Sequence, residues 1–254
     1  MQKIWVCGAR GQIGQAVNDV VDKLEFEMLD TDVDDLDVTD TDEVLRFGEM
    51  NRPDIIINCS GMTDISSCEE NPSQAFKVNA LGARNLAIVA AKMQAKMVQL
   101  STDDVFDGKS TEPYTEFDIT NPGTVYGKSK LAGENYVKEF TTKHFIVRST
   151  WVYGKGQNFI NGFLKKVDAG EQLSIASDQF GSPTSANELA RFLLHLVHTS
   201  EYGTYHATNK GVCSRYAFAQ EILKMTGKTA SMQPVPTVMS DFSKVRPAYA
   251  VLDN

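Results

Sequence analysis

Three residues of this chain carry side chains that together suit the reduction of a carbonyl group. Tyr126 and Lys130 are four residues apart, which places a phenol and an ammonium on one face of a helix. Thr102 follows a short apolar run that begins at Met97. Hydride transfer to a ketone carbon builds negative charge on the oxygen, which then needs a proton donor. We expect Tyr126 to donate this proton and Thr102 to hold the oxygen in line.

Lys130 has two expected roles in this chemistry. A free tyrosine has a pKa near ~10, and a neighbouring ammonium lowers it by favouring the phenolate. The same ammonium can hold the ribose of a nicotinamide cofactor. Because a tyrosine and a lysine at this spacing also occur by chance on solvated helix faces, the hypothesis depends on the elements around them.

A glycine-rich turn follows the first predicted strand, Lys3 to Cys7, and leads into an amphipathic segment that continues to about Leu24. Glycines allow backbone conformations that other residues avoid, and the amides at a helix start can bind a pyrophosphate. The spacing Gly-x-x-Gly-x-x-Gly between strand and helix therefore favours a dinucleotide site over a plain turn. The candidate cofactor-binding residues of the turn are Gly8, Arg10, Gly11, Gln12, Ile13 and Gly14.

An acidic residue follows the second strand-like run, Phe26 to Leu29. Asp30 lies sixteen residues after Gly14, close to the place where a carboxylate accepts hydrogen bonds from the adenosine ribose. Asp30 would repel the 2′-phosphate of NADPH, whereas Arg10 would attract it. We therefore expect NADH or NADPH as the cofactor, with NADH favoured and dual use allowed.

The segment 30–42 is rich in aspartate, which raises the alternative of a calcium-binding loop. Asp35 stands where such a loop needs glycine, and Thr41 stands where it needs a bidentate glutamate. The run is therefore interpreted as a solvated loop that leads to a helix capped near Asp40. Besides Asp30, only Asp37 in this loop is a ligand candidate, and no metal site is expected.

Strand-like and helix-like segments alternate through the first 150 residues and predict an α/β fold. Residues 1–150 are expected to form a Rossmann-type domain with a doubly wound parallel sheet. Residues 151–254 are expected to form mainly a smaller substrate-binding lobe, with some elements returning to the first domain. Predicted strands are 3–7, 26–29, 55–59, 97–100 and 144–147, and predicted helices include 71–95, 124–142, 159–168, 187–198 and 214–226.

Composition and charge exclude several classes of function. A net charge of −8 without a basic stripe argues against a nucleic-acid partner. No apolar run approaches the length of a membrane span, and the chain starts directly in a predicted strand, so we expect neither a membrane partner nor a secretion signal. The four cysteines show no Cys-x-x-Cys spacing, which favours reduced thiols and a cytoplasmic location. A homodimer remains an open alternative.

A series of motifs in one order extends over nearly the whole chain, and with it the chain resembles the extended short-chain dehydrogenases/reductases. Within them it resembles the dTDP-4-dehydrorhamnose reductase family. This resemblance implies reduction, by NADH or NADPH, of the 4-keto group of a nucleotide-linked deoxysugar. The motifs are the glycine turn at 8–14, Arg-Pro-Asp at 52–54, Ser-Thr-Asp at 101–103, Val-Phe-Asp-Gly at 105–108, Tyr-Gly-x-x-Lys-Leu-Ala-Gly-Glu at 126–134, Trp-Val-Tyr at 151–153, Asp-Gln-x-Gly-x-Pro-Thr at 178–184 and Arg-Pro at 246–247.

The resemblance also implies roles for individual residues. Thr102, Tyr126 and Lys130 take the catalytic roles described above. The glycine turn would hold the dinucleotide together with Asp30, Asp37 and Val38. The positions expected near the sugar nucleotide are Thr63, Ile65, Trp151, Asn158 and Arg246.

Two residues depart from the pattern of this family. Asp104 stands where a tyrosine is usual, which changes an expected substrate contact in size and charge, and Ala250 replaces the usual serine. A carboxylate near a nucleotide diphosphate is unfavourable unless a cation or a hydrogen bond offsets it.

Two alternatives share this scaffold. One is another nucleotide-sugar reductase or epimerase. The other is a non-catalytic binding protein resembling the regulatory subunit of methionine adenosyltransferase, against which the presence of Thr102, Tyr126 and Lys130 argues.

Overall fold

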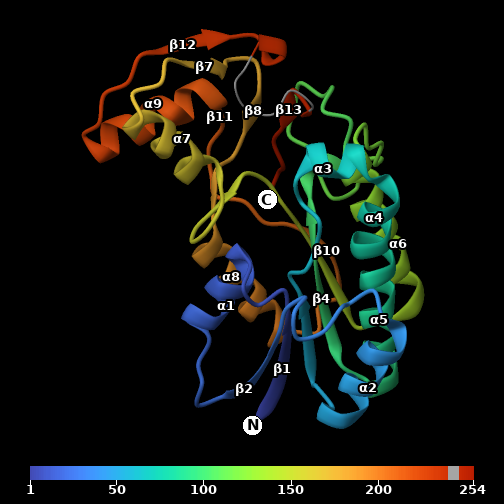
Figure 1. The fold of residues 1–254 in the computed structure, drawn as a ribbon. Helices are drawn as coiled ribbons and strands as arrows, with labels where there is room; N and C mark the ends of the chain where they lie inside the picture. The colour runs from blue at the N-terminus through green and yellow to red at the C-terminus, as the bar shows by residue number, and fades with distance from the viewer. Residues whose placement is uncertain (240–245) are drawn as a thin grey trace.

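A single parallel sheet of six strands forms the centre of the protein (Figure 1). The computed structural model describes residues 1–239 and 246–254. The strand order is β10-β5-β4-β3-β1-β2, and every neighbouring pair is parallel. The strands are β1 (Gln2–Cys7), β2 (Phe26–Thr31), β3 (Ile55–Asn58), β4 (Lys96–Thr102), β5 (His144–Ser149) and β10 (Gly203–His206).

Helices cover both faces of the sheet, which explains why its inner strands are apolar on both sides. Every residue of β3 is buried. One face packs against α1 (Gln12–Val20) and α8 (Ala186–Val197), and the other against α2 (Thr41–Asn51), α5 (Ala83–Met93) and α6 (Val125–Phe140) (Figure 1). The predicted doubly wound, Rossmann-type sheet is confirmed.

The direction of winding reverses at β1, which lies between β2 and β3. In open parallel sheets, ligands bind at such a reversal, outside the carboxyl ends of the strands. The glycine turn leaves the carboxyl end of β1, and the loop from Cys59 leaves that of β3. The fold therefore creates a crevice beside the glycine turn.

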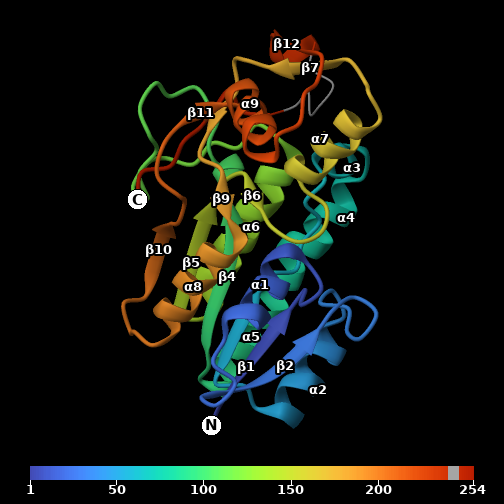
Figure 2. The same cartoon turned by 90° about the vertical axis from the view of Figure 1, so that its left-hand side faces the viewer.

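The remaining elements form a smaller lobe above the carboxyl ends of the strands (Figures 1 and 2). Its helices α7 (Phe159–Asp168) and α9 (Arg215–Thr226) pack around a separate apolar cluster that includes Phe163. Residues 186–206 leave this lobe and contribute α8 and β10 to the sheet layers. The short strands are β6 (Val152–Tyr153), β7 (Leu173–Ala176), β8 (Phe180–Gly181), β9 (Thr184–Ser185), β11 (Cys213–Ser214), β12 (Met232–Val235) and β13 (Tyr249–Ala250).

The single helix predicted over 71–95 is divided in the structure. It consists of α4 (Pro72–Phe76), a π-helical turn η1 (Lys77–Gly82) and α5, preceded by a separate short helix α3 (Ile65–Glu70). The π turn contains Asn79, whose side chain is buried and bonded to a neighbouring loop and helix. Hydrophobic periodicity does not reveal this turn, because one extra residue per turn alters the pattern only locally.

Two 3₁₀ turns complete the described secondary structure, η2 (Asp103–Val105) and η3 (Thr237–Met239). Among the described residues, no helix combines the length and apolar character needed to cross a bilayer.

Candidate active site

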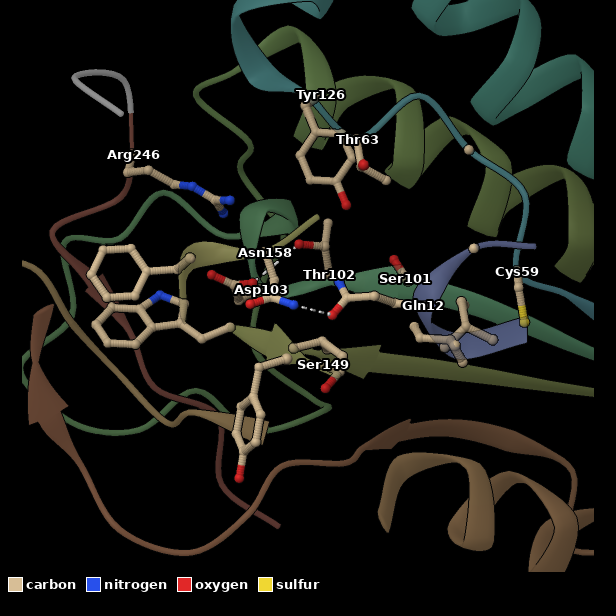
Figure 3. A pocket seen from close by; sticks show the side chains of 18 of the residues that line it. Gln12, Cys59, Thr63, Ser101, Thr102, Asp103, Tyr126, Ser149, Asn158 and Arg246 are labelled. Atoms are coloured by element: carbon tan, nitrogen blue, oxygen red, sulfur yellow. Dashed lines mark hydrogen bonds between the residues drawn. The ribbon is translucent and has the colours of Figure 1, made fainter. Parts of the chain in front are cut away.

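The end of β4 and the start of α6 bring Thr102 and Tyr126 together. Thr124 caps α6, its hydroxyl oxygen accepting a hydrogen bond from the Gly127 amide at 2.9 Å. A Cβ at Gly127 would lie 2.0 Å from the carbonyl oxygen of Asp104, so only glycine allows the helix to approach the strand end this closely. The Tyr126 hydroxyl points towards Thr102 as a result (Figure 3).

The surroundings of Tyr126 favour the protonated phenol. Burial raises the pKa of Tyr126, and the negative charge of Asp104 raises it further. The charge of Arg246 and the hydroxyl of Thr102 lower this pKa in part. Because the net shift is upward, these surroundings favour the neutral phenol, which is the form that can donate a proton. The cation found to act on it is Arg246, whereas Lys130 was expected in that role.

Lys130 lies one helical turn after Tyr126 on α6, and its side chain is buried. Burial lowers the pKa of Lys130 to about 8, although the negative charge of Glu134 opposes this shift. The charge of Lys130 lowers the pKa of the Cys59 thiol. Burial outweighs this effect and raises that pKa to about 12. Lys130 lines neither of the cavities described below. Its Nζ atom lies near the loop after β3, 3.8 Å from where a Cβ at Gly61 would be.

A cavity of about 500 Å³ lies between the carboxyl edge of the sheet and the smaller lobe (Figure 3). Thr102 and Tyr126 line it, and both are buried. Asn158 donates a hydrogen bond to Gln12 across 3.2 Å, which joins the smaller lobe to the glycine turn. The other sequence-predicted residues that line this cavity are Gly11, Gln12, Ile13, Thr63, Trp151, Asn158 and Arg246.

A second cavity, of about 380 Å³, lies between the glycine turn and the loops that follow β2 and β3. Gly8, Gly11, Asp37 and Val38 line it. Its position at the reversal of the sheet suits the adenosine end of a dinucleotide.

The glycine turn is shaped for close backbone approach. Gly8 has a φ of 75°, and a Cβ there would lie 2.7 Å from the Ser60 amide nitrogen. A Cβ at Gly14 would lie 2.4 Å from the Gly8 carbonyl oxygen, so this glycine is required for the packing of α1 on the turn. The Gly-x-x-Gly-x-x-Gly spacing thus leaves a cradle beside the first amides of α1, and a pyrophosphate fits there.

Asp30 does not reach this cradle, contrary to the expectation from its position. Strand β2 continues to Thr31, and the side chain of Asp30 is exposed on this edge strand, outside both cavities. Asp32 lines the adenosine cavity instead and accepts a hydrogen bond from the Arg10 amide at 2.8 Å. The sequence predicts that this strand ends at Leu29, because the residues after Leu29 are polar and resemble a loop.

Arg10 lines neither cavity. Its guanidinium lies 3.1 Å from the carboxylate of Asp34 and 3.3 Å from that of Asp35. The aspartate-rich loop therefore already engages the cation that would attract a 2′-phosphate.

Two residues predicted to contact the sugar nucleotide line neither cavity. Ile65 is buried at the start of α3, in an apolar cluster with Tyr126. Asp104 is fully buried and forms an ion pair with Arg246 at 2.9 Å. The cation needed to offset this carboxylate is therefore present in the protein itself.

The sequence did not reveal the contacts of Arg215 and Asp103 in the large cavity, or those of Asn79 outside it. The guanidinium of Arg215 lies 3.5 Å from the ring centre of Trp151, and burial lowers its pKa to about 9. Burial and the charge of Asp104 raise the pKa of Asp103 to about 7. Asn79 bonds the backbone of Met62 and, at 2.8 Å, the hydroxyl of Ser129 next to Lys130. The contacts of Arg215 and Asn79 join distant segments, so no local motif signals them.

Comparisons with known proteins agree with this site. A family model described as the RmlD substrate binding domain matches residues 1–254. The spore coat polysaccharide biosynthesis protein SpsK of Bacillus subtilis is 35% identical, and the match covers 100% of this chain and 90% of SpsK.

Solved structures give the same result. A dTDP-4-dehydrorhamnose reductase of Clostridium acetobutylicum superposes with a TM-score of 0.96 at 42% identity, over 100% of this chain and 90% of that chain. The dTDP-4-dehydrorhamnose reductase of Bacillus anthracis in complex with NADP has a TM-score of 0.96 at 37% identity, with the same coverage. The resemblance inferred from the sequence motifs is confirmed. The chain belongs to the family of proteins with an RmlD substrate-binding domain.

Proposed function

We propose that this protein is an NAD(P)H-dependent reductase that converts the 4-keto group of dTDP-4-dehydrorhamnose to the hydroxyl group of dTDP-L-rhamnose. The observation that carries this proposal is the meeting of a protonated Tyr126 and the Thr102 hydroxyl in one cavity beside the glycine cradle. The relatives named dTDP-4-dehydrorhamnose reductase support the same substrate.

The residues of the cavity divide the reaction among them. The bound nicotinamide supplies the hydride. The hydroxyl of Thr102 donates a hydrogen bond to Asp103 at 3.1 Å, and it can turn to hold the substrate carbonyl oxygen. Tyr126 donates its proton to that oxygen as negative charge develops. We infer from the family resemblance that Lys130, one turn away on α6, holds the ribose of the nicotinamide.

Trp151 and Arg215 form a flat cationic and aromatic wall of the cavity. Asn158 of the same lobe donates a hydrogen bond to Gln12 at the start of α1. Such a wall suits the nucleotide portion of the substrate. Together with Thr63 and Arg246 on the other sides, these residues would hold the sugar nucleotide over the hydride donor.

Electrostatics at the adenosine cavity favour NADH. Asp32 lines this cavity and would repel a 2′-phosphate, while Arg10 is engaged by other carboxylates. Because the Bacillus anthracis relative was solved with NADP, a second assay should use NADPH. We expect turnover with both cofactors and a lower KM for NADH.

The decisive experiment is the loss of NADH or NADPH absorbance with purified protein and dTDP-4-dehydrorhamnose. Turnover with stoichiometric oxidation of the cofactor supports the proposal. An epimerase regenerates its cofactor and would show no net oxidation. A folded protein that binds the nucleotides without turnover would instead favour a regulatory binding role.

We place this reaction in the cytoplasm, because all four cysteines are free thiols, as a reducing compartment maintains them. A homodimer stays a prediction, which light scattering of the purified protein at several concentrations checks.

A further inference from the structure

Asp104 and Arg246 are 142 residues apart in the sequence and meet beside Tyr126. The Arg246 Nη1 group donates a hydrogen bond to Asp104 Oδ2 at 2.9 Å. Asp104 belongs to η2 at the end of β4, and Arg246 precedes β13 of the smaller lobe. The pair therefore connects the catalytic strand end to the wall of the cavity, where Arg246 points inwards (Figure 3).

The two side chains differ in their access to the cavity. Asp104 has 0% of its side chain exposed and does not line the cavity, whereas Arg246 has 27% exposed and does. Arg246 thus stands between the carboxylate and the space for substrate. Its Nε–H group is buried and has no hydrogen-bond partner among the residues that the structure describes. A buried donor of this kind is costly unless a ligand satisfies it.

The ion pair is not needed to anchor the C-terminal segment. Backbone hydrogen bonds already hold that segment, from Phe180 to the Ala248 carbonyl at 2.8 Å and from Tyr114 to the Val251 carbonyl at 2.9 Å. What the carboxylate adds is a fixed direction for one guanidinium. Arginine side chains lose much conformational freedom when they bind, so fixing one in advance strengthens binding.

We propose that Asp104 is a positioning residue that holds Arg246 ready for the diphosphate group of the nucleotide-sugar substrate. This inference rests on the proposed function. A guanidinium with one edge on a carboxylate keeps other N–H groups free for phosphate oxygens. Asp104 also balances the charge of Arg246 while the cavity awaits substrate. Asp104, which departs from the family pattern, thus acts through Arg246, which matches that pattern.

The test compares Asp104→Asn, Arg246→Gln and the double variant by steady-state kinetics and by calorimetric binding of dTDP. In Asp104→Asn we expect the KM for the nucleotide sugar and the Kd for dTDP to rise about tenfold, as for loss of a charge-assisted contact. The kcat should change by about threefold or less, since diphosphate binding is shared by ground and transition states. The affinity for NADH and the melting temperature should stay near wild type.

The double variant separates positioning from other roles. If Asp104 acts through Arg246, adding Asp104→Asn to Arg246→Gln should change the KM by less than about twofold. The matched control is Asp19→Asn, because Asp19 and Lys155 form another long-range ion pair, at 2.6 Å on the surface. This control should leave every constant unchanged.

Three results would overturn the inference: wild-type binding in Asp104→Asn, an undiminished effect of that change in the Arg246→Gln background, or a loss confined to stability. If Asp104→Asn does not fold, Asp104→Tyr replaces it, because tyrosine is the residue usual in the family. Should neither fold, the pair is structural and the inference fails. A wild-type protein without turnover contradicts the proposed function alone, and dTDP binding still decides the role of Asp104.

Discussion

Glu134 and Arg148 form a buried ion pair that ties helix α6, which carries Tyr126, to strand β5. The two guanidinium nitrogens Nε and Nη2 lie 2.9 and 2.7 Å from the two carboxylate oxygens of Glu134, and Ser101 donates to the same carboxylate. The side chains are 0% and 3% exposed. The pair fixes α6 against β5, and the Ser101 bond fixes it against β4, which delivers Thr102. Glu134 and Arg148 thus support the site without lining the cavity.

We expect Glu134→Gln to destabilise the fold by about 3–5 kcal/mol, because it leaves the buried charge of Arg148 uncompensated. The free energy of unfolding in urea measures this loss. Glu139→Gln, an exposed carboxylate on the same helix, is the control and should change stability by less than about 0.5 kcal/mol. Equal stability of the two variants would contradict the structural role of the pair.

Removing the hydroxyl of Tyr126, the proposed proton donor, should abolish most of the activity. Tyr126→Phe keeps the buried ring and loses the hydroxyl, so we expect kcat to fall about 10²–10⁴-fold. The affinity for NADH, measured by fluorescence titration, should remain within about threefold of wild type. Tyr136→Phe on the same helix is the control and should retain activity. Substantial reductase activity in Tyr126→Phe would assign proton transfer to another group.

The close contact of α6 with the strand end makes Gly127 sensitive to substitution. In Gly127→Ala the new methyl group would meet the Asp104 carbonyl oxygen, so Thr102 and Tyr126 must move apart. We expect a loss of about 1–3 kcal/mol in unfolding free energy and a lower kcat. Gly123→Ala is the matched control, because a Cβ there meets nothing within 4 Å. Similar kinetics for both variants would show that this approach is not required.

The raised pKa of Asp103, about 7, predicts a pH-dependent difference in stability. An aspartate titrates near ~3.9 in the unfolded chain, so between about pH 4 and 7 the unfolded state loses this proton while the native state keeps it. Asp103 therefore destabilises the native state increasingly as the pH rises through this window. Asp103→Asn removes the effect, and its stability relative to wild type should rise from about pH 4 to 7 and then level off.

Chemical denaturation of both proteins at a series of pH values measures this difference. Asp118→Asn provides the opposite control, because hydrogen bonds from Thr115 lower the pKa of Asp118. Its contribution to stability is present at neutral pH and is lost as the pH falls. A difference for Asp103→Asn that does not vary with pH would show that the native carboxyl titrates normally.

The choice between cofactors should depend on Asp32. Asp32→Asn keeps an oxygen that accepts from the Arg10 amide and removes the charge next to the adenosine cavity. We expect the KM for NADPH to fall about tenfold relative to that for NADH, because the carboxylate of Asp32 no longer repels the 2′-phosphate. Asp30→Asn is the control, and its KM ratio should equal that of wild type. If Asp30→Asn changed the ratio of the KM values and Asp32→Asn did not, Asp30 would be the ribose ligand.

Local patterns were enough to predict most elements of the sheet and its helices. The apolar run before the glycine turn ends where β1 ends, at Cys7, since buried parallel strands are apolar on both faces. The run predicted over 97–100 is confirmed as a strand, but β4 continues to Thr102. Strand β2 was predicted too short because it is an edge strand, whose exposed face tolerates the polar Asp30. The π turn at Asn79 was missed because buried side-chain hydrogen bonds hold it.

The sequence by itself determined the alternating α/β order, the glycine turn and the pairing of Tyr126 with Lys130 on one helix. Each depends on residues close together in the chain, where spacing and backbone geometry are coupled. Only the tertiary structure decided that Asp32 faces the adenosine cavity, that Arg246 balances Asp104, and that Arg215 stacks on Trp151. Those contacts join segments of different strands and of the smaller lobe, and packing, not spacing, brings them together.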